Sequence, residues 1–273
     1  MQVGSKTIND AIMEIEYSES FFLSAGETDA EGELSLPLLT SKLIDIATAH
    51  ANALGIGNPS MAHLRRGWVL SRLAIEMERY PHVNETYTLT TWVESWNRHF
   101  SERNFCISDA EGKPLGYARS IWMVLDTETR ESTGLTHLDL SPEIISGREC
   151  PIAKQGKHHP ILPPDYAGDL PRGAYRATVA PEQYRFKYCD LDFYRHVNTV
   201  RYVQMLLNRF PLSFYDRNEI RRMELTFMKE SVYGQTVDIF RSEQDDETLF
   251  SLNDAQSGEA LLFAMLRFAG RGV

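Results

Sequence analysis

The chain carries, between Cys189 and Phe210, the stretch CDLDFYRHVNTVRYVQMLLNRF. It begins with two acids, Asp190 and Asp192, and places His196 four residues after the second one. Farther along, apolar residues recur at the three- and four-residue spacing of one buried helical face. These apolar residues are Val200, Val203, Leu207 and Phe210. The pattern predicts an irregular loop, holding a carboxylate and an imidazole, that leads into a buried helix.

The start of this predicted helix is where chemistry is expected. Asn198 or Thr199 can serve as its N-cap. Free backbone N–H groups and the positive end of the helix dipole gather there, which suits a carbonyl that becomes an oxyanion. From the residues alone, a structural role is equally open, with Asp192 as a helix cap and His196 as a half-buried side chain.

The stretch resembles the signature of acyl-acyl carrier protein thioesterases of the plant plastid and bacterial type. The residues that carry the resemblance are Asp190-Leu-Asp, then His196-Val-Asn, then Val200-Arg-Tyr. Four pieces of the first half follow the family's order and spacing: Arg66-Gly-Trp-Val-Leu-Ser-Arg-Leu, Arg79-Tyr-Pro, Thr91-Trp-Val and Arg119-Ser-Ile-Trp-Met-Val-Leu-Asp. The resemblance covers residues 12–270 and implies two hotdog domains in tandem that release free fatty acid from the carrier protein.

The pattern of the first half fits that fold independently. After a strand-like run from Glu14 to Leu23, a helix rich in Ala and Leu is expected between Ser35 and Gly55, with His50 as a packed core residue. After this helix, apolar residues recur at every second position, which predicts strands over residues 67–79, 87–96, 103–108 and 115–125. A long helix followed by several antiparallel strands favours an α+β fold, with an antiparallel sheet wrapped around a long central helix.

The second half repeats this order. A strand at 184–188, a helix at 198–210 and strands from Arg222 onward echo the first half at offsets of about 145 to 163 residues, which indicates a duplicated domain. Six of the twelve prolines lie between Pro151 and Pro181 and predict a linker. We therefore expect an N-terminal, acyl-chain-binding domain over 1–150, a linker over 151–181 and a catalytic domain over 182–273.

The resemblance also assigns roles. It implies Glu230 as the general base for water, His196 as the group that orients the thioester or Glu230, and Asp192 as the residue that fixes the imidazole. An alternating strand pattern places Glu230 on a strand. Two positions depart from the family: Tyr194 stands where the family has Asn, and Ser231 where it has Cys. The second departure excludes a thiol nucleophile at that place.

Substrate contacts are expected from Tyr194, Asn198 and Trp68. The acyl chain needs an apolar tunnel, and the strands of Trp68, Trp92 and Trp122 can supply apolar side chains to line it. The sequence does not set the length or saturation of the preferred acyl chain. Three other functions remain open as well: an acyl-CoA thioesterase, a hotdog dehydratase, and a non-catalytic acyl-binding protein if Tyr194 disables the site.

The net charge of −10 argues against a nucleic-acid-binding protein. The same negative charge repels an acidic acyl carrier protein at long range, so docking of such a partner needs a local basic surface. Arg195 and Arg201, which flank the predicted catalytic loop, are the preferred pair. The other candidate pairs are Arg65 with Arg66, Arg98 with Arg103, and Arg221 with Arg222.

No cofactor or metal is expected. The three cysteines are far apart and outside any CxxC motif, and the doublet His158–His159 lacks a third ligand. The N-terminus has neither a signal-peptide nor a transit-peptide pattern, and no segment is apolar enough to span a membrane. A cytosolic protein is therefore expected, and a homodimer is a candidate assembly.

Overall fold

The computed structural model describes residues 15–136, 138, 140–156 and 160–272. Its helices are α1 (Leu36–Ala53), α2 (Asn58–Ala62), α3 (Thr199–Leu207) and α4 (Leu212–Tyr215). Its strands are β1 (Glu16–Phe22), β2 (Arg66–Met77), β3 (Thr86–Trp96), β4 (Ser101–Asp109), β5 (Pro114–Asp126), β6 (Ile161–Leu162), β7 (Tyr175–Arg176), β8 (Glu182–Arg185), β9 (Asn218–Phe227), β10 (Thr236–Glu243), β11 (Glu247–Asp254) and β12 (Ala260–Gly270). All except β6 and β7 form one ten-stranded antiparallel sheet, in the order β1-β3-β4-β5-β2-β9-β12-β11-β10-β8.

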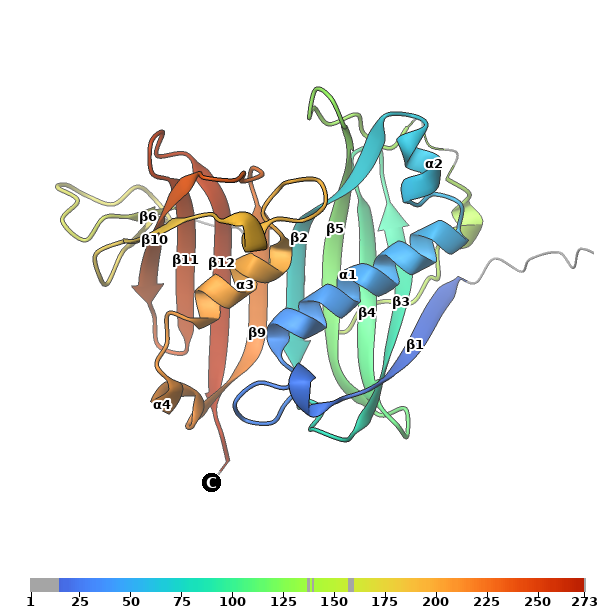
Figure 1. The fold of residues 1–273 in the computed structure, drawn as a ribbon, viewed down its shortest axis with the longest axis horizontal. Coiled ribbons are helices and arrows are strands. Elements are labelled where there is room, and N and C mark those ends of the chain that lie inside the picture. Colours follow the sequence, from blue (N-terminus) through green and yellow to red (C-terminus); the bar gives the residue numbers. More distant parts are fainter. Residues whose placement is uncertain (1–14, 137, 139, 157–159, 273) are drawn as a thin grey trace, which may run out of the picture.

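Helices α1 and α3 lie on one face of this sheet (Figure 1). Helix α1 crosses the strands of the first half, with Leu39, Leu43, Ile46 and His50 buried, as their common stripe predicts. Helix α3 crosses the second half, and the Asn198 side chain caps it by accepting the N–H of Val200 at 2.9 Å. Each half is thus a sheet wrapped around a helix, which confirms the predicted pair of tandem hotdogs.

The two halves meet at β2 and β9, which pair antiparallel from Arg72 opposite Thr226 to Glu76 opposite Arg222. Helices α1 and α3 also lie against each other across this seam (Figure 1). A continuous sheet and a shared helical layer bury one core, because side chains of both halves belong to the same apolar cluster.

The halves repeat each other down to individual hydrogen bonds. Asp192 Oδ1 accepts the backbone N–H of His196 at 3.1 Å, and the Asp192 N–H donates to the His196 carbonyl at 2.8 Å. In the first half, Asp29 Oδ1 accepts the N–H of Glu33 at 3.0 Å, and the Asp29 N–H donates to the Glu33 carbonyl at 2.9 Å. Glu33 therefore takes, in the first half, the place that His196 has in the second.

The surroundings of Glu33 differ sharply from those of His196. Arg271, just after β12, donates to both carboxylate oxygens of Glu33 at 2.8 Å. The Glu33 side chain is only 8% exposed. We call this loop, residues 29–33, the counterpart loop. Its Glu33 carboxylate is paired with Arg271 and buried.

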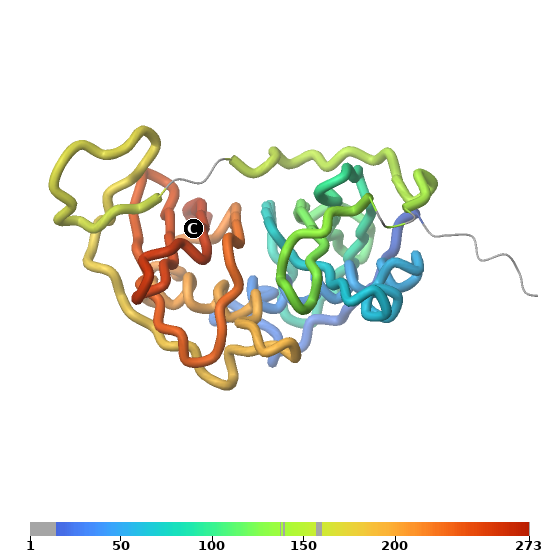
Figure 2. The backbone as a smooth tube through the Cα atoms, turned by 90° about the horizontal axis from the view of Figure 1, so that it is seen from above, coloured from blue at the N-terminus to red at the C-terminus, as the bar shows by residue number. Residues whose placement is uncertain are grey.

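The chain crosses between the halves on the face of the sheet opposite the helices (Figure 2). There, Trp92 Nε1 donates to the carbonyl of Arg148 at 2.7 Å, and Gln155 Nε2 donates to that of Leu225 at 2.8 Å. The crossing segment therefore contacts strands on both sides of the seam. The boundaries at 150 and 181 remain a prediction, and Glu14, His158 and His159 lie outside the described residues.

Among the helices that the structure describes, none combines the length and the apolar character needed to cross a membrane.

Candidate active site at the seam

A cavity of about 1030 Å³ opens at the seam between the two halves. Its walls come from α1, from strands β2 to β5 and from the loops around Asp192 and Glu230. All six predicted site residues line it: Asp192, Tyr194, His196, Asn198, Glu230 and Trp68. The structure therefore brings together residues that are up to 162 positions apart, since Trp68 and Glu230 share one cavity.

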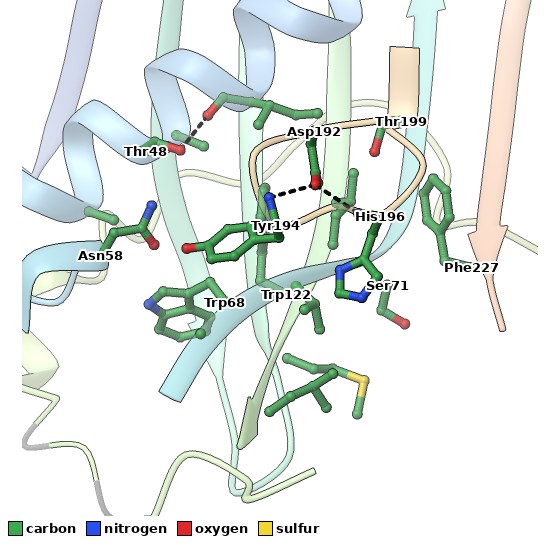
Figure 3. Close-up of a pocket in the computed structure, with 18 of the residues that line it drawn as sticks. Thr48, Asn58, Trp68, Ser71, Trp122, Asp192, Tyr194, His196, Thr199 and Phe227 are labelled. Carbon is green, nitrogen blue, oxygen red and sulfur yellow. Dashed lines mark hydrogen bonds between the residues drawn. The ribbon is translucent and has the colours of Figure 1, made fainter. Parts of the chain in front are cut away.

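The loop that carries His196 is held in shape by Asp192. Its Oδ1 atom accepts the backbone N–H groups of Tyr194 at 2.9 Å and His196 at 3.1 Å (Figure 3). Arg195 between them has a positive φ of 65°, a conformation that costs free energy for a residue with a Cβ. Asp192 thus fixes the backbone that presents the imidazole, and it does so through main-chain N–H groups and not through the ring.

His196 faces Glu230 across the mouth of the cavity. The Nε2 atom of His196 lies 3.6 Å from Oε2 of Glu230, somewhat longer than a normal hydrogen bond. Their side chains are 25% and 35% exposed. Backbone pairing keeps the two loops in register, because His196 forms an isolated bridge with Val232 and the Val197 N–H donates to the Ser231 carbonyl at 2.9 Å.

The expectation that Glu230 lies on a strand is wrong. Strand β9 ends at Phe227, and Glu230 follows in the connection to β10. The ladder with β12 ends at the same point, where Leu262 opposes Phe227. The N–H groups of Met228 and Lys229 still donate to the carbonyl of Leu261, and Glu230 follows them beside the His196 loop. The alternating pattern continued past the end of the ladder and gave no sign of this stop.

Arg130, which the sequence reading missed, completes the group. It lies in the turn after β5, at a positive φ of 61°, and its Nε atom donates to Glu230 Oε2 at 2.9 Å. Its Nη2 atom binds the other carboxylate oxygen. A fork of this kind holds a carboxylate in one orientation. The first half therefore supplies a cation to the acid of the second half.

Tyr194 and Trp68 also line the cavity, and Figure 3 shows both rings below the His196 loop. The Tyr194 ring lies 3.8 Å from that of Phe193, centroid to centroid, and remains 49% exposed. Trp68 Nε1 donates to the carbonyl of Ile56 at 2.8 Å, which leaves the indole faces for apolar contact. Both residues are placed to contact a substrate.

The start of α3 offers a backbone donor. The N–H of Asn198 is engaged by Asp190, and that of Val200 by the Asn198 side chain. The N–H of Thr199 makes no hydrogen bond to the described part of the chain. Because this residue opens the helix and lines the cavity, its N–H can donate a hydrogen bond to a carbonyl oxygen there.

The expected tunnel differs in two ways from the prediction. Trp92 lies on the opposite face of the sheet, packed with Cys106, Cys150 and Ile152, so it does not line the cavity. Arg103, which was expected in a basic docking surface, is 5% exposed and lines the cavity from inside. Trp92 is therefore wrong as tunnel material, and Arg103 is wrong as part of an exposed docking surface.

Ser231, at the position of the family's cysteine, is fully buried, and its carbonyl accepts from the His196 loop. The three cysteines are free, and only Cys189 is exposed. In the described ranges, no cluster of three or more His, Cys, Asp or Glu side chains is arranged to hold a metal ion.

Two models of one protein family match the chain. Residues 14–138 match the acyl-ACP thioesterase N-terminal domain, and residues 175–265 match the acyl-ACP thioesterase C-terminal domain. The chain belongs to the acyl-ACP thioesterase family. The order of the two matches agrees with the order of the two hotdog halves.

Solved structures of this family share the fold. The acyl-ACP thioesterase from Bacteroides thetaiotaomicron is 29% identical, with a TM-score of 0.82 over 93% of this chain and 98% of that one. The 12:0-ACP thioesterase from Umbellularia californica is 18% identical, with a TM-score of 0.74 over 95% of this chain and 96% of that one, which shows the fold alone.

A curated relative is the chloroplastic palmitoyl-acyl carrier protein thioesterase of Gossypium hirsutum, which is 24% identical over 255 residues. The match covers 91% of this chain but 59% of the relative. The chain thus spans less than two thirds of that relative's length.

Proposed function

We propose that this protein hydrolyses the thioester of a fatty acyl-acyl carrier protein and releases the free fatty acid. The observation that carries the proposal is the approach of His196 Nε2 to Glu230 Oε2, 3.6 Å, at the mouth of a cavity of about 1030 Å³. Thioester hydrolysis needs a base that activates water and donors for the oxyanion, and a carboxylate, an imidazole and the unbonded N–H of Thr199 belong to residues that line this cavity.

In this mechanism Glu230 is the general base that takes a proton from water. His196 hydrogen-bonds and orients the thioester, or the carboxylate of Glu230, and Asp192 acts indirectly by holding the backbone of the His196 loop. The N–H of Thr199 at the start of α3 stabilises the oxyanion. Water gives a proton to Glu230 and adds to the carbonyl carbon, which forms a tetrahedral oxyanion. Its collapse re-forms the carbonyl and breaks the C–S bond, and the departing thiolate takes the proton from Glu230 and leaves as the carrier's thiol.

A carrier protein as partner is supported by the surface around the mouth. Large apolar side chains stay exposed on the two loops that meet there, and this set, which we call the entrance patch, is Tyr188, Phe193, Tyr194, Met228, Val232 and Tyr233. Exposed apolar clusters of this kind mark interaction sites. Arg195, exposed in the same loop, adds a positive charge for an acidic partner.

The test is to assay purified protein for free thiol and free acid with matched acyl-carrier protein and acyl-CoA substrates. Faster turnover of the carrier substrate supports the proposal, and faster turnover of the CoA substrate favours the acyl-CoA thioesterase. Binding of acyl groups without product would make it an acyl-binding protein, and release of water from a hydroxyacyl substrate would make it a dehydratase. A cytosolic location, a homodimer and the domain boundaries stay predictions from the sequence.

A further inference from the structure

The guanidinium of Arg103 lies inside the first hotdog half, on the face of β4 that α1 covers. Its Nη1 atom donates to Nδ1 of His50 at 2.7 Å and to the hydroxyl of Thr91 at 3.2 Å. The whole residue is 5% exposed. Burial lowers the pKa of Arg103 to about 10, so the group stays charged at neutral pH.

No carboxylate among the described residues pairs with this cation. The contrast is Arg222, which is buried to a similar extent but binds Glu76 at 2.6 Å and Glu224 at 2.7 Å. A buried charge without a partner costs free energy, and proteins rarely keep one unless something else pairs with it. Arg103 therefore lacks the counterpart that Arg222 has.

Two nitrogens of Arg103 remain for such a partner. Nε and Nη2 have no acceptor in the part of the chain that the structure describes, and neither is sealed off as a buried unpaired atom. Arg103 is one of the residues that line the cavity of the active site. An oxygen-bearing group in the cavity could accept from both at once.

The position of Arg103 relates it to the reacting thioester. Strands β4, β5, β2 and β9 are consecutive in the sheet, so β4 lies three strand spacings, roughly 14 Å, from the strand that leads to Glu230. An acyl chain whose thioester lies between His196 and Glu230 would extend into the first half, toward Arg103. The cavity wall between them includes Trp122, Leu70 and Val69.

We propose that Arg103 binds an oxygen acceptor at the far end of the acyl chain, so that the preferred substrate carries a terminal carboxylate or hydroxyl in place of a methyl group. The proposal rests on the thioesterase function proposed above and names the class of its acyl group. His50 and Thr91 hold the guanidinium in place, and the bound oxygen supplies the missing acceptor. A methyl end would leave the buried cation without a partner.

The test compares three thioesters of one carbon number on the same carrier: an ω-carboxyl, an ω-hydroxyl and a plain acyl chain. In the unmodified protein, kcat/KM should be about ten-fold higher for at least one oxygenated chain than for the plain chain. Arg103→Met should abolish or reverse this preference, and Arg103→Lys should keep part of it. Arg119→Met, on the opposite face of the neighbouring strand and outside the cavity, should leave the preference unchanged.

A binding measurement separates this proposal from the thioesterase function. Calorimetry with the free α,ω-dicarboxylic acid and the monocarboxylic acid of equal length should show tighter binding of the diacid, and Arg103→Met should remove the difference. Equal affinities, or a plain chain that is hydrolysed best, would overturn the role of Arg103. If no thioester is hydrolysed, the proposed function fails, and calorimetry alone decides for or against the diacid site.

Discussion

Arg130 of the first half holds the carboxylate of Glu230 in the second half, with its Nε atom 2.9 Å from Oε2 and its Nη2 atom on Oε1. The two residues are 100 positions apart in the chain. The same carboxylate oxygen, Oε2, lies 3.6 Å from His196. The candidate base is therefore oriented from one side by a cation and approached from the other by the imidazole.

Arg130→Met should lower kcat about ten-fold with a small change in KM, because Glu230 would lose the fork that orients it. Arg130→Lys keeps the charge but not the fork, and should lose less. In the Glu230→Gln background, adding Arg130→Met should cost nothing further, since residues that act through one contact are not additive. Independent, additive losses would show that Arg130 acts elsewhere, and steady-state kinetics of the four proteins measures this.

Glu230→Gln should lower kcat by about two orders of magnitude or more, as removal of a general base does. The melting temperature should change little, because the side chain is 35% exposed and outside the sheet ladder. Glu128→Gln is the matched control, because Glu128 also pairs with an arginine, Arg65, but outside the cavity. Near-normal turnover of Glu230→Gln would exclude it as the base.

Tyr194→Asn restores the amide that the family has at this position. Turnover should hold or rise, because the change removes a large ring from the cavity while the Asp192 bond to the backbone N–H remains possible. Tyr188→Asn, in the same loop but outside the cavity, is the control. A loss of more than ten-fold confined to Tyr194→Asn would mean that its ring or hydroxyl contacts the substrate.

Arg195→Glu should raise KM for an acyl-carrier protein several-fold more than for the matching acyl-CoA. Arg195 is exposed beside the entrance patch, whereas Arg201 is partly buried and donates to Gln204, so Arg195 is the stronger half of the predicted pair. The difference should shrink as ionic strength rises, because salt screens exposed charges. Lys113→Glu, at the opposite end of the sheet, should change neither KM. An equal rise in KM for both substrates would show instead that Arg195 holds the loop in shape or contacts the phosphopantetheine arm that both substrates share.

Glu33→Gln should destabilise the protein by about 3 kcal/mol, because it leaves the Arg271 guanidinium without its anionic partner. Hydrogen bonding to Glu33 raises the pKa of Arg271 above its ordinary value, which agrees with a strong pair. For a chain of this size the loss corresponds to a fall in Tm of several degrees. Thermal unfolding measures it, and kcat should stay unchanged. A large loss of turnover at unchanged Tm would contradict a purely structural role for the pair.

Much of the fold could be predicted because it follows from short-range pattern. The stripe on α1 and the change to strand period each depend on residues close in sequence, and the echo between the halves is a repeat of such local patterns. Within the site, the loop from Asp192 to His196 and its helix were predictable for the same reason. Their positions relative to Glu230 came only from the resemblance.

The rest depends on which face of a strand a residue occupies and where a ladder stops. Trp92 and Arg103 both lie on strands rich in apolar and polar residues, so neither alternation nor composition fixed their side of the sheet. Arg130 is a lone arginine in a turn, and nothing near it in sequence points to Glu230. Such pairings arise from the tertiary fold, which a single sequence does not display.

The pairing of Glu33 with Arg271 has a consequence for stoichiometry. Where two identical hotdog subunits associate, symmetry gives each of them the same loop, and both copies of the site carry the same side chains. Fusion into one chain removes that constraint. Here one loop presents His196, while Glu33 of the counterpart loop is held in an ion pair with Arg271. Each chain should therefore turn over one acyl group at a time. The ion pair between Glu33 and Arg271 leaves the counterpart loop with a structural role only.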